Sequence, residues 1–328
     1  MQLIANNNPV QNIIQDTSEI ITQSSSGFIE ANTQEVTLEH LKKECIIPVF
    51  SKDNETTISH AQFIEKTTEV VQGFFPEMLV NQPQIRVSHV VKGRVPSAIG
   101  KPAKDLLEEE KTIYYERCAF LIELPEVFEV VNGNKITLNI GGVRAYNQEN
   151  LYSKKSLEKF KIFIGFKNTV CTNLCISTDG FLNEVRISSI HELTNQMEGL
   201  FSNYNKEKHL TLMLKMPQYS FTEKQFAHFI GKIKMYQHLS KAEKQLIFPI
   251  ALTESQIGNI IKNYYQCPNF GRSLDGSINF WKLYNLITEA NKSSYIDSNF
   301  ERNVCAYELV NELGYSMKNR EPNWLTSN

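Results

Sequence analysis

The chain has 328 residues, of which 41% are hydrophobic and 21% are charged, and its formal net charge is -2. A chain of this length and composition can bury a full hydrophobic core without a metal ion or disulfide to hold it together. A nearly neutral chain does not coat nucleic acid by bulk electrostatics. Any nucleic-acid contact must therefore come from a local basic surface.

Six cysteines are spread along the chain rather than grouped at the spacing of a metal site. In a chain of this length, scattered cysteines are typical of reduced thiols in the interior of a cytoplasmic protein. The first residues lack a basic stretch followed by an apolar run, and nowhere does an apolar run reach the length of a membrane span. We therefore expect a cytoplasmic protein with no metal, no cofactor and no membrane contact.

The first part of the chain predicts a polar arm, then a strand and a helix. Residues 1–36 are dominated by Asn, Gln, Ser and Thr, a composition that cannot bury enough apolar surface to fold by itself. The run at 45–50 indicates a strand. Ser59 and Gln62 form the capping-box pattern at the start of a helix that ends before Pro76.

The middle of the chain is rich in strand patterns. Alternation of apolar and polar residues predicts a strand at 84–91, and the spacing of apolar residues predicts a helix at 102–117. Asn132 and Gly133 separate two β-type runs, and this dipeptide supplies the positive φ angles of a tight hairpin turn. Further strands are expected at 160–166, 169–177 and 183–188.

The last third of the chain changes to helical periodicity. Capping boxes at Thr222 with Gln225 and at Thr253 with Gln256 predict two helix starts. Two more helices are expected at 280–290 and 300–313, the second ended by Gly314. These patterns predict an α+β fold in which a central antiparallel sheet, built from about 84–216, has flanking helices and a helical C-terminal half at about 220–328. We expect one domain over 37–328 and a separate arm over 1–36.

Four stretches of sequence carry a family resemblance. They are EKTIYYER at 110–117, NLYSKKS at 150–156, VCTNLCISTDG at 170–180 and LYNLITEANKSSYID at 283–297. Together they resemble the bacterial family catalogued as domain of unknown function 3871, which is similar at a distance to the phage- and plasmid-like unknown-function family 932. The resemblance implies a protein carried on a conjugative mobile element. It supplies no catalytic residue.

The densest polar cluster directly follows an amphipathic helix. Its members are Thr288, Glu289, Asn291, Lys292, Ser293, Ser294, Tyr295 and Asp297. Convergent donors and acceptors of this kind can line a binding or catalytic pocket. The same residue types also end helices and build connecting turns by bonding free backbone groups. The sequence leaves both interpretations open.

Two lysine-rich segments are candidates for a nucleic-acid surface. Their candidate residues are Lys154, Lys155, Lys159, Lys161, Lys167, Lys206, Lys208, Lys232 and Lys234. In the first segment Phe160, Phe163 and Phe166 lie between the lysines, and a single strand needs cations for its phosphates and rings for its bases. Strand alternation would instead place some of these rings in the core. A third basic patch surrounds an expected loop and contains Arg86, Lys92, Arg94, Lys101 and Lys104.

Two further motifs are expected to have structural rather than functional roles. Cys171 and Cys175 are four residues apart on an expected strand and would point to one side, but no second ligand pair follows, so we expect buried thiols. A nucleophilic Cys171 would need a base such as His191 brought close by folding. Gly141 and Gly142 do not have phosphate-loop spacing, and we expect a bulge or tight bend there.

These patterns are compatible with three functions. We favour a binding protein over an enzyme. The first is a non-enzymatic protein that binds DNA or RNA through the lysine-rich surfaces, helped by self-association into a homo-oligomer. The second is an enzyme of unrecognised class with a pocket around 288–297. The third is an interaction protein that inhibits a host defence enzyme.

Overall fold

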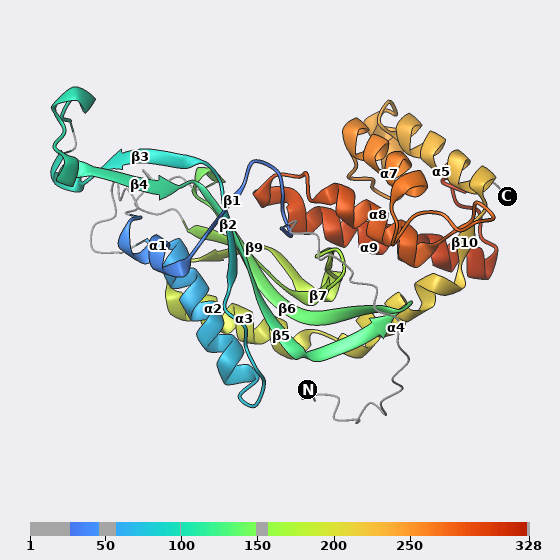
Figure 1. The fold of residues 1–328 in the computed structure, drawn as a ribbon, viewed down its shortest axis with the longest axis horizontal. Coiled ribbons are helices and arrows are strands. Elements are labelled where there is room, and N and C mark those ends of the chain that lie inside the picture. The colour runs from blue at the N-terminus through green and yellow to red at the C-terminus, as the bar shows by residue number, and fades with distance from the viewer. Residues whose placement is uncertain (1–26, 46–56, 99, 149–156, 327–328) are drawn as a thin grey trace.

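The computed structural model describes residues 27–45, 57–98, 100–148 and 157–326. A curved antiparallel sheet lies at the centre, with helices on both of its faces and a helical C-terminal half beside it (Figure 1). The α+β class predicted from the sequence is confirmed. Within the described residues, no helix is both long enough and apolar enough to pass through a bilayer.

The central sheet has one long hairpin at its middle. In spatial order its strands are β1 (Gln34–Val36), β2 (Gln84–Val87), β5 (Arg117–Val131), β6 (Asn134–Ala145) and β7 (Glu158–Asn168), and the other edge of β7 pairs with β8 (Leu174–Cys175) and β9 (Phe181–Ile187). The predicted hairpin joins β5 to β6, with φ angles of 50° at Asn132 and 78° at Gly133. These angles belong to the tight turn that the Asn-Gly pair favours.

The glycine pair lies inside β6 and not at a bend, so the expected bulge is wrong. Gly141 and Gly142 are both paired with β5 and with β7 in unbroken register. A Cβ on Gly141 would lie 2.4 Å from the carbonyl oxygen of Phe120, and one on Gly142 would lie 2.4 Å from the ring of Phe63. Glycine is required here because neighbouring groups pack against the backbone from both faces of the sheet.

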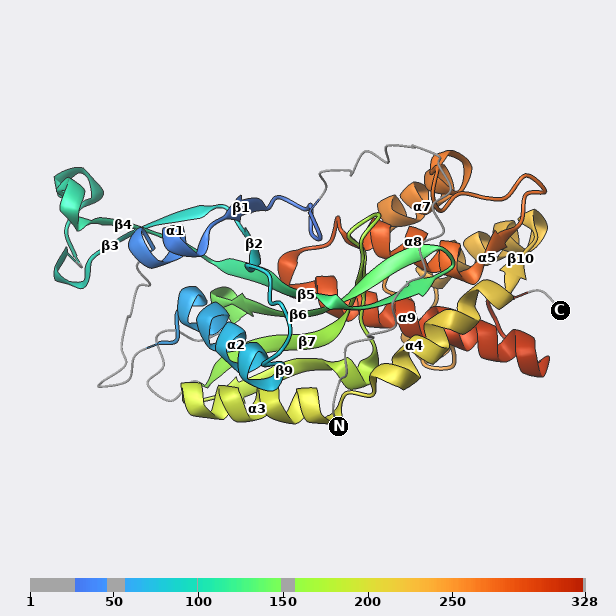
Figure 2. The same ribbon diagram turned by 60° about the horizontal axis from the view of Figure 1, so that its bottom comes forward.

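One face of the sheet is covered by α2 (His60–Phe74) and α3 (Ile190–Asn203) (Figure 2). The short helix α1 (Leu38–Lys43) packs on α2, and α4 (Lys206–Lys215) follows α3. The predicted capping box of Ser59 and Gln62 starts α2. Phe63 of α2 packs edge-on against Phe120 and Phe160 of the sheet, with ring centroids 5.0 and 4.7 Å away. The sheet therefore ends at Ile187, because two amphipathic helices occupy much of the part predicted to be sheet up to 216.

The four helices predicted for the C-terminal half are all present, but the last one extends beyond both of its predicted ends and a further short helix was not predicted. The helices of this half are α5 (Glu223–Tyr236), α6 (Lys241–Lys244), α7 (Glu254–Gln266), α8 (Phe280–Asn291) and α9 (Ile296–Asn319), and the short strands β10 (Ser220–Phe221) and β11 (Ile278–Asn279) pair beside them. Both predicted capping boxes are present. Gly314 does not end α9, which continues to a left-handed residue, Arg320, with a φ of 56°.

The N-terminal part of α9 covers the second face of the sheet together with the first described residues. Phe300 packs edge-on against Phe163, with centroids 4.6 Å apart, and both belong to a separate apolar cluster with Phe28 and Ile29. The described part of the predicted arm, Gly27–Val36, is thus packed into the fold, and its last three residues form β1.

A two-stranded arm stands out from the body, where the sequence predicted a helix at 102–117 (Figures 1 and 2). It consists of β3 (Val90–Arg94), β4 (Lys111–Tyr115) and the short 3₁₀ turns Pro96–Ala98, Ala103–Asp105 and Glu108–Glu110 between them. The helix prediction was wrong because the β-branched and aromatic run Thr112–Tyr115 favours a strand once β3 is available to pair with it. The expected strand at 84–91 is split by Ser88 and His89, where the arm leaves the sheet.

Of two further predicted strands, one lies mostly outside the described residues and the other is shorter than predicted. Of the strand at 45–50 only Cys45 is described, as an isolated parallel bridge to Ile113, and the rest lies outside the described residues. Of the strand at 169–177 only Leu174–Cys175 is extended in the sheet. The remaining 3₁₀ turns are Tyr146–Gln148, Thr178–Gly180 and Met216–Gln218.

Candidate functional site

The predicted polar cluster at 288–297 spans the end of α8, the turn after it and the start of α9, and half of its eight side chains are buried. Thr288, Asn291, Lys292 and Ser294 are buried, whereas Ser293 and Tyr295 are exposed. The Thr288 hydroxyl donates to the carbonyl of Tyr284 at 3.0 Å, and the Asn291 amide donates to the carbonyl of Arg302 at 3.0 Å. These bonds hold helix backbones together, which is the turn-building interpretation of the cluster.

Lys292 is the most enclosed charge of this cluster. Its side chain is 2% exposed, and its ammonium group lies 2.9 Å from the carboxylate of Glu289 and donates to the carbonyl of Cys171. Its own carbonyl accepts the backbone N–H of Glu30 at 2.9 Å. Lys292 thus ties three segments together: the N-terminal residues, the turn after β7, and the end of α8.

Asn285 is the centre of the same network and was missed by the sequence analysis. Its side-chain oxygen accepts the amide of Asn168 at 3.0 Å, its carbonyl accepts the amide of Asn173 at 2.9 Å, and its own amide donates to Trp281 at 2.9 Å. A fully buried Asn that uses this many groups fixes how α8 sits against the end of β7. Its sequence signal was a polar residue at an apolar helix position.

The cysteines near this network are poor nucleophiles. Cys171 lies in the turn after β7 and not on a strand, so it does not share a strand face with Cys175 as expected. Burial raises the pKa of both thiols to about 12, which keeps them protonated at neutral pH. His191 is an exposed residue of α3. Within the described parts of the chain, no three His, Cys, Asp or Glu side chains form a possible metal site.

The candidate lysines do not form one surface. Lys167 is buried against Glu123 at 3.0 Å, Lys232 lies 4.6 Å from the ring centroid of Trp324, and Lys234 pairs with Glu254 at 2.8 Å. Lys206 and Lys208 lie on α4. Lys154 and Lys155 lie outside the described residues.

The rings between the first lysines belong to the core. Phe160, Phe163 and Phe166 are each at most 1% exposed. They cannot stack on nucleic-acid bases, so the expected platform of alternating lysines and rings is wrong for β7. Strand alternation accounts for this, because it directs these side chains toward the layers of helices.

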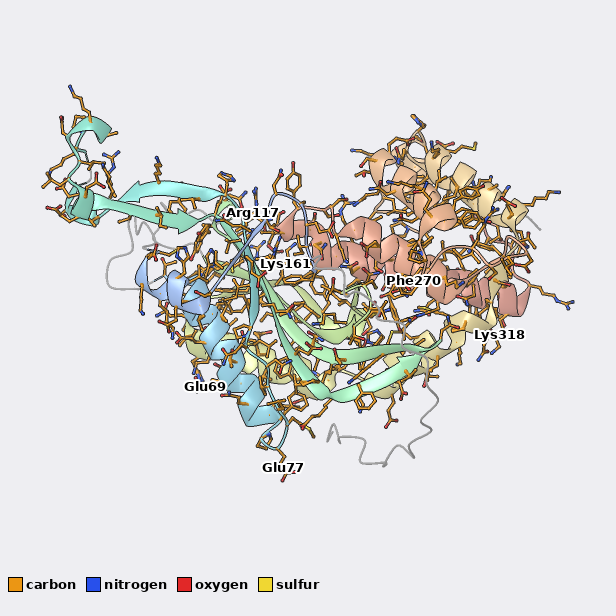
Figure 3. All side chains as sticks on the ribbon, viewed as in Figure 1. Glu69, Glu77, Arg117, Lys161, Phe270 and Lys318 are labelled. Carbon is orange, nitrogen blue, oxygen red and sulfur yellow. The ribbon has the colours of Figure 1, made fainter. Side chains whose placement is uncertain are left out.

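Lys159 and Lys161 do come together with other polar groups at one end of the sheet. Their strand borders a hollow of about 210 Å³ between the sheet and α9. We call this the sheet-end hollow; its polar lining residues are Gln148, Lys159, Lys161, Asn183, Glu184 and Glu301. Figure 3 places Arg117 and Lys161 near the N-terminal end of α9. Two groups that are separate in sequence, the lysine segment and the start of α9, therefore meet here.

Ion pairs connect these groups. Lys161 donates to the carboxylate of Glu301 and to the carbonyl of Asp297, both at 2.6 Å, while the Gln148 amide donates to the Asp297 carboxylate at 3.0 Å. Arg117 approaches the same carboxylate at 3.8 Å. Asp297 is thus the one member of the 288–297 cluster that joins the rim of the hollow.

The other rim of the hollow holds a shared carboxylate. Glu184 on β9 lies 2.8 Å from Arg186 and 3.3 Å from Lys159. The hydrogen bonds from Arg186 and Lys159 hold the pKa of Glu184 below its ordinary value, so it stays ionised at neutral pH. These pairs are accessible to solvent, so an incoming ligand can exchange for them at low cost.

Comparison with known protein families assigns the chain to one of them. Residues 9–326 match the family described as "Domain of unknown function, B. Theta Gene description (DUF3871)". The chain belongs to this family. No curated protein and no solved structure matches it. The resemblance to family 3871 seen in the sequence is confirmed, and membership of this family assigns no activity to any of the residues above.

Proposed function

We propose that this DUF3871 protein is a non-enzymatic nucleic-acid-binding protein that contacts its ligand at the sheet-end hollow. The observation that carries the proposal is the gathering of four cations from three strands around one polar hollow. Lys159 and Lys161 of β7 line the hollow. Arg117 of β5 and Arg186 of β9 lie outside its lining and pair with Asp297 and Glu184 at its rim. Cations of this kind bind phosphate oxygens and release counterions.

The remaining polar groups of the hollow suit the rest of a nucleotide. The amides of Gln148 and Asn183 can donate to phosphates or accept from bases, and the carboxylate of Glu184 can accept from base amino groups. A nucleic acid presents both kinds of group in every unit. A mixed lining of cations, amides and carboxylates therefore fits it better than it fits a simple anion.

The enzyme alternative has less support from the geometry. The 288–297 side chains that would have built its pocket mostly bond to backbone groups, and only Asp297 reaches the rim of the sheet-end hollow. An inhibitor of a host enzyme would need a docking surface, and no feature of the described residues assigns one. A DNA-binding role is also the one that accords with the mobile-element setting implied by the resemblance.

A binding titration at two salt concentrations tests the proposal. Fluorescent single- and double-stranded DNA and RNA would be titrated with the wild-type protein and with the double variant Lys159→Gln/Lys161→Gln. The matched control is Lys232→Gln/Lys234→Gln, which removes the same charge from α5. Each lost phosphate contact lowers the salt dependence of log K by about one.

We expect the wild type to bind at low salt, the hollow variant to lose affinity and salt dependence, and the control to retain both. Absence of wild-type binding at low salt would refute nucleic-acid binding. Equal losses in both double variants would show that general charge, rather than the hollow, is responsible.

A further inference from the structure

The arm formed by β3 and β4 is a charged feature outside the hollow. It projects from the body in both views (Figures 1 and 2). On its β4 strand, Ile113 forms a bridge with Cys45 and the Tyr115 hydroxyl bonds to His40. A two-stranded ribbon by itself is only marginally stable in water. Such a ribbon gains most from a partner that surrounds it.

The ionisable groups of the arm are arranged by strand register. Lys92 is paired with Ile113, and Arg94 is paired with Lys111. Directly paired residues of an antiparallel ribbon point to the same side, and so do residues two apart. The three cations of the two strands therefore share one face.

No carboxylate accompanies these cations within the strands. Neither Val90–Arg94 nor Lys111–Tyr115 contains Asp or Glu. The acidic residues of the arm, Asp105 and Glu108–Glu110, are confined to the turns that connect its strands. The carboxylate of Glu108 lies 2.5 Å from the ammonium group of Lys111. Both side chains are exposed, so a phosphate can replace Glu108 as the partner of Lys111 at low cost. The length of the ribbon is thus basic on one face, while its tip is of mixed charge.

The arm and the sheet-end hollow are neighbours in the fold. Arg117 begins β5 two residues after β4 ends, and its partner in β6, Ala145, lines the hollow. The backbone N–H of Ser88 donates to the carbonyl of Arg117 at 3.0 Å just before β3 begins. Both strands of the arm therefore leave the body next to the hollow. One ligand can contact the two features together.

We propose that the arm enters the major groove of double-stranded DNA, an inference that rests on the proposed function and names its substrate class. The major groove of B-form DNA is about 12 Å wide and admits a two-stranded β-ribbon. Phosphates line both edges of that groove, where the lysine and arginine side chains of an inserted ribbon reach them.

Duplex RNA and single strands offer no equivalent site. The major groove of A-form RNA is deep and too narrow for side chains to read, and a single strand has no groove at all. The arm therefore discriminates among nucleic acids by shape, whereas the hollow contacts phosphates that all of them carry. A change in the arm should therefore alter the preference for duplex DNA. A change in the hollow should alter the affinity for every nucleic acid.

The test compares duplex DNA, duplex RNA of the same sequence, and single-stranded DNA as fluorescent probes. The arm variant is Lys92→Gln/Lys111→Gln, and Lys92→Arg/Lys111→Arg is its conservative counterpart that retains the charge. We expect the wild type to bind duplex DNA about tenfold or more tighter than duplex RNA, the Gln variant to lose most of that preference, and the Arg variant to keep it.

The hollow variant Lys159→Gln/Lys161→Gln serves as the second comparison. It weakens binding to all three probes by similar factors and leaves the preference for duplex DNA in place. If the wild type binds all probes equally, or the Gln arm variant keeps the full preference, the inference about the arm is wrong while nucleic-acid binding stands. If no probe binds at low salt, the proposed function itself fails and takes this inference with it.

Discussion

The 288–297 turn and the sheet-end hollow contain the same kinds of residue but in opposite environments. In the turn, Lys292 is buried and bonded to the carbonyl of Cys171 and to Glu289. In the hollow, Lys159 and Lys161 pair with carboxylates that remain accessible to solvent. A buried polar group stabilises a fold because losing a partner is costly, whereas an exposed one is available to a ligand. Polar density along the sequence does not distinguish the two.

The largest effect is expected at the centre of the buried network. Asn285→Ala should lower the free energy of unfolding by about 2–3 kcal/mol, because it leaves the buried amide of Asn168 without its acceptor and creates a small cavity. Chemical denaturation measures it. A loss below about 0.5 kcal/mol, typical of a surface site, would mean that this network does not hold α8 to the sheet.

The next effect concerns Lys292, one of the cluster residues that could line a pocket or build a turn. Lys292→Ala should lower the free energy of unfolding by about 2 kcal/mol, because it removes a buried ion-pair partner and the bond to the Cys171 carbonyl. Lys292→Met keeps most of the buried stem and should recover part of the loss. An Ala variant as stable as the wild type would contradict the structural role.

The pH dependence of stability separates buried groups from exposed ones. Burial lowers the pKa of His60 and of His209 to about 3, and the charge of Arg144 adds to the effect at His60. An unfolded histidine titrates near about 6.5, so below that pH the unfolded state binds more protons than the folded state. The contribution of these histidines to stability is therefore fully present above about pH 6.5 and falls as the pH decreases toward about 3.

A variant isolates this contribution. The Tyr204 hydroxyl and Nδ1 of His209 share a hydrogen bond of 2.8 Å, and the amide of Gln offers both a neutral donor and a neutral acceptor there. His209→Gln should be less stable than the wild type at neutral pH but should lose less stability between about pH 6.5 and pH 5, above the range in which most carboxylates titrate. Denaturation at several pH values measures it. Identical slopes in both proteins would exclude His209 as a source of the dependence.

The smallest effect on stability is expected at the hollow. Glu301→Gln removes the carboxylate partner of Lys161 and should change the free energy of unfolding by less than about 0.5–1 kcal/mol, because the pair is only partly buried. Under the proposed function the same variant should bind nucleic acid more tightly, since Lys161 is released for a phosphate. Weaker binding by this variant would mean that Glu301, and not Lys161, contacts the ligand.

The sequence predicted the fold where local signals agree with tertiary packing. Three capping boxes and the Asn-Gly turn were all found as predicted, because each is satisfied by residues three or fewer positions apart. The arm was missed because its strands obtain their partner across a connection of sixteen residues, from Arg94 to Lys111. No local pattern contains that pairing.

The candidate site was predicted only in part. Lys159, Lys161 and Asp297 were named from the sequence, but their meeting depends on β7 lying beside the start of α9, which is a tertiary contact of 136 residues in sequence separation. Arg117, Gln148 and Glu301 had no signal because each is an ordinary surface residue until the fold assembles them. The phenylalanines of β7 show the reverse error, since rings that alternate with lysines were core residues.

Stability and nucleic-acid binding, both measured on the same two variants, decide which of the two regions binds the ligand and which one stabilises the fold. Lys292→Ala should lower the denaturation midpoint while its folded fraction binds like the wild type. Lys159→Gln/Lys161→Gln should keep its midpoint nearly unchanged while its binding at low salt weakens about tenfold or more. If instead Lys292→Ala abolishes binding without loss of stability and the double variant binds normally, the functional site is the 288–297 turn and the roles of the two regions are reversed.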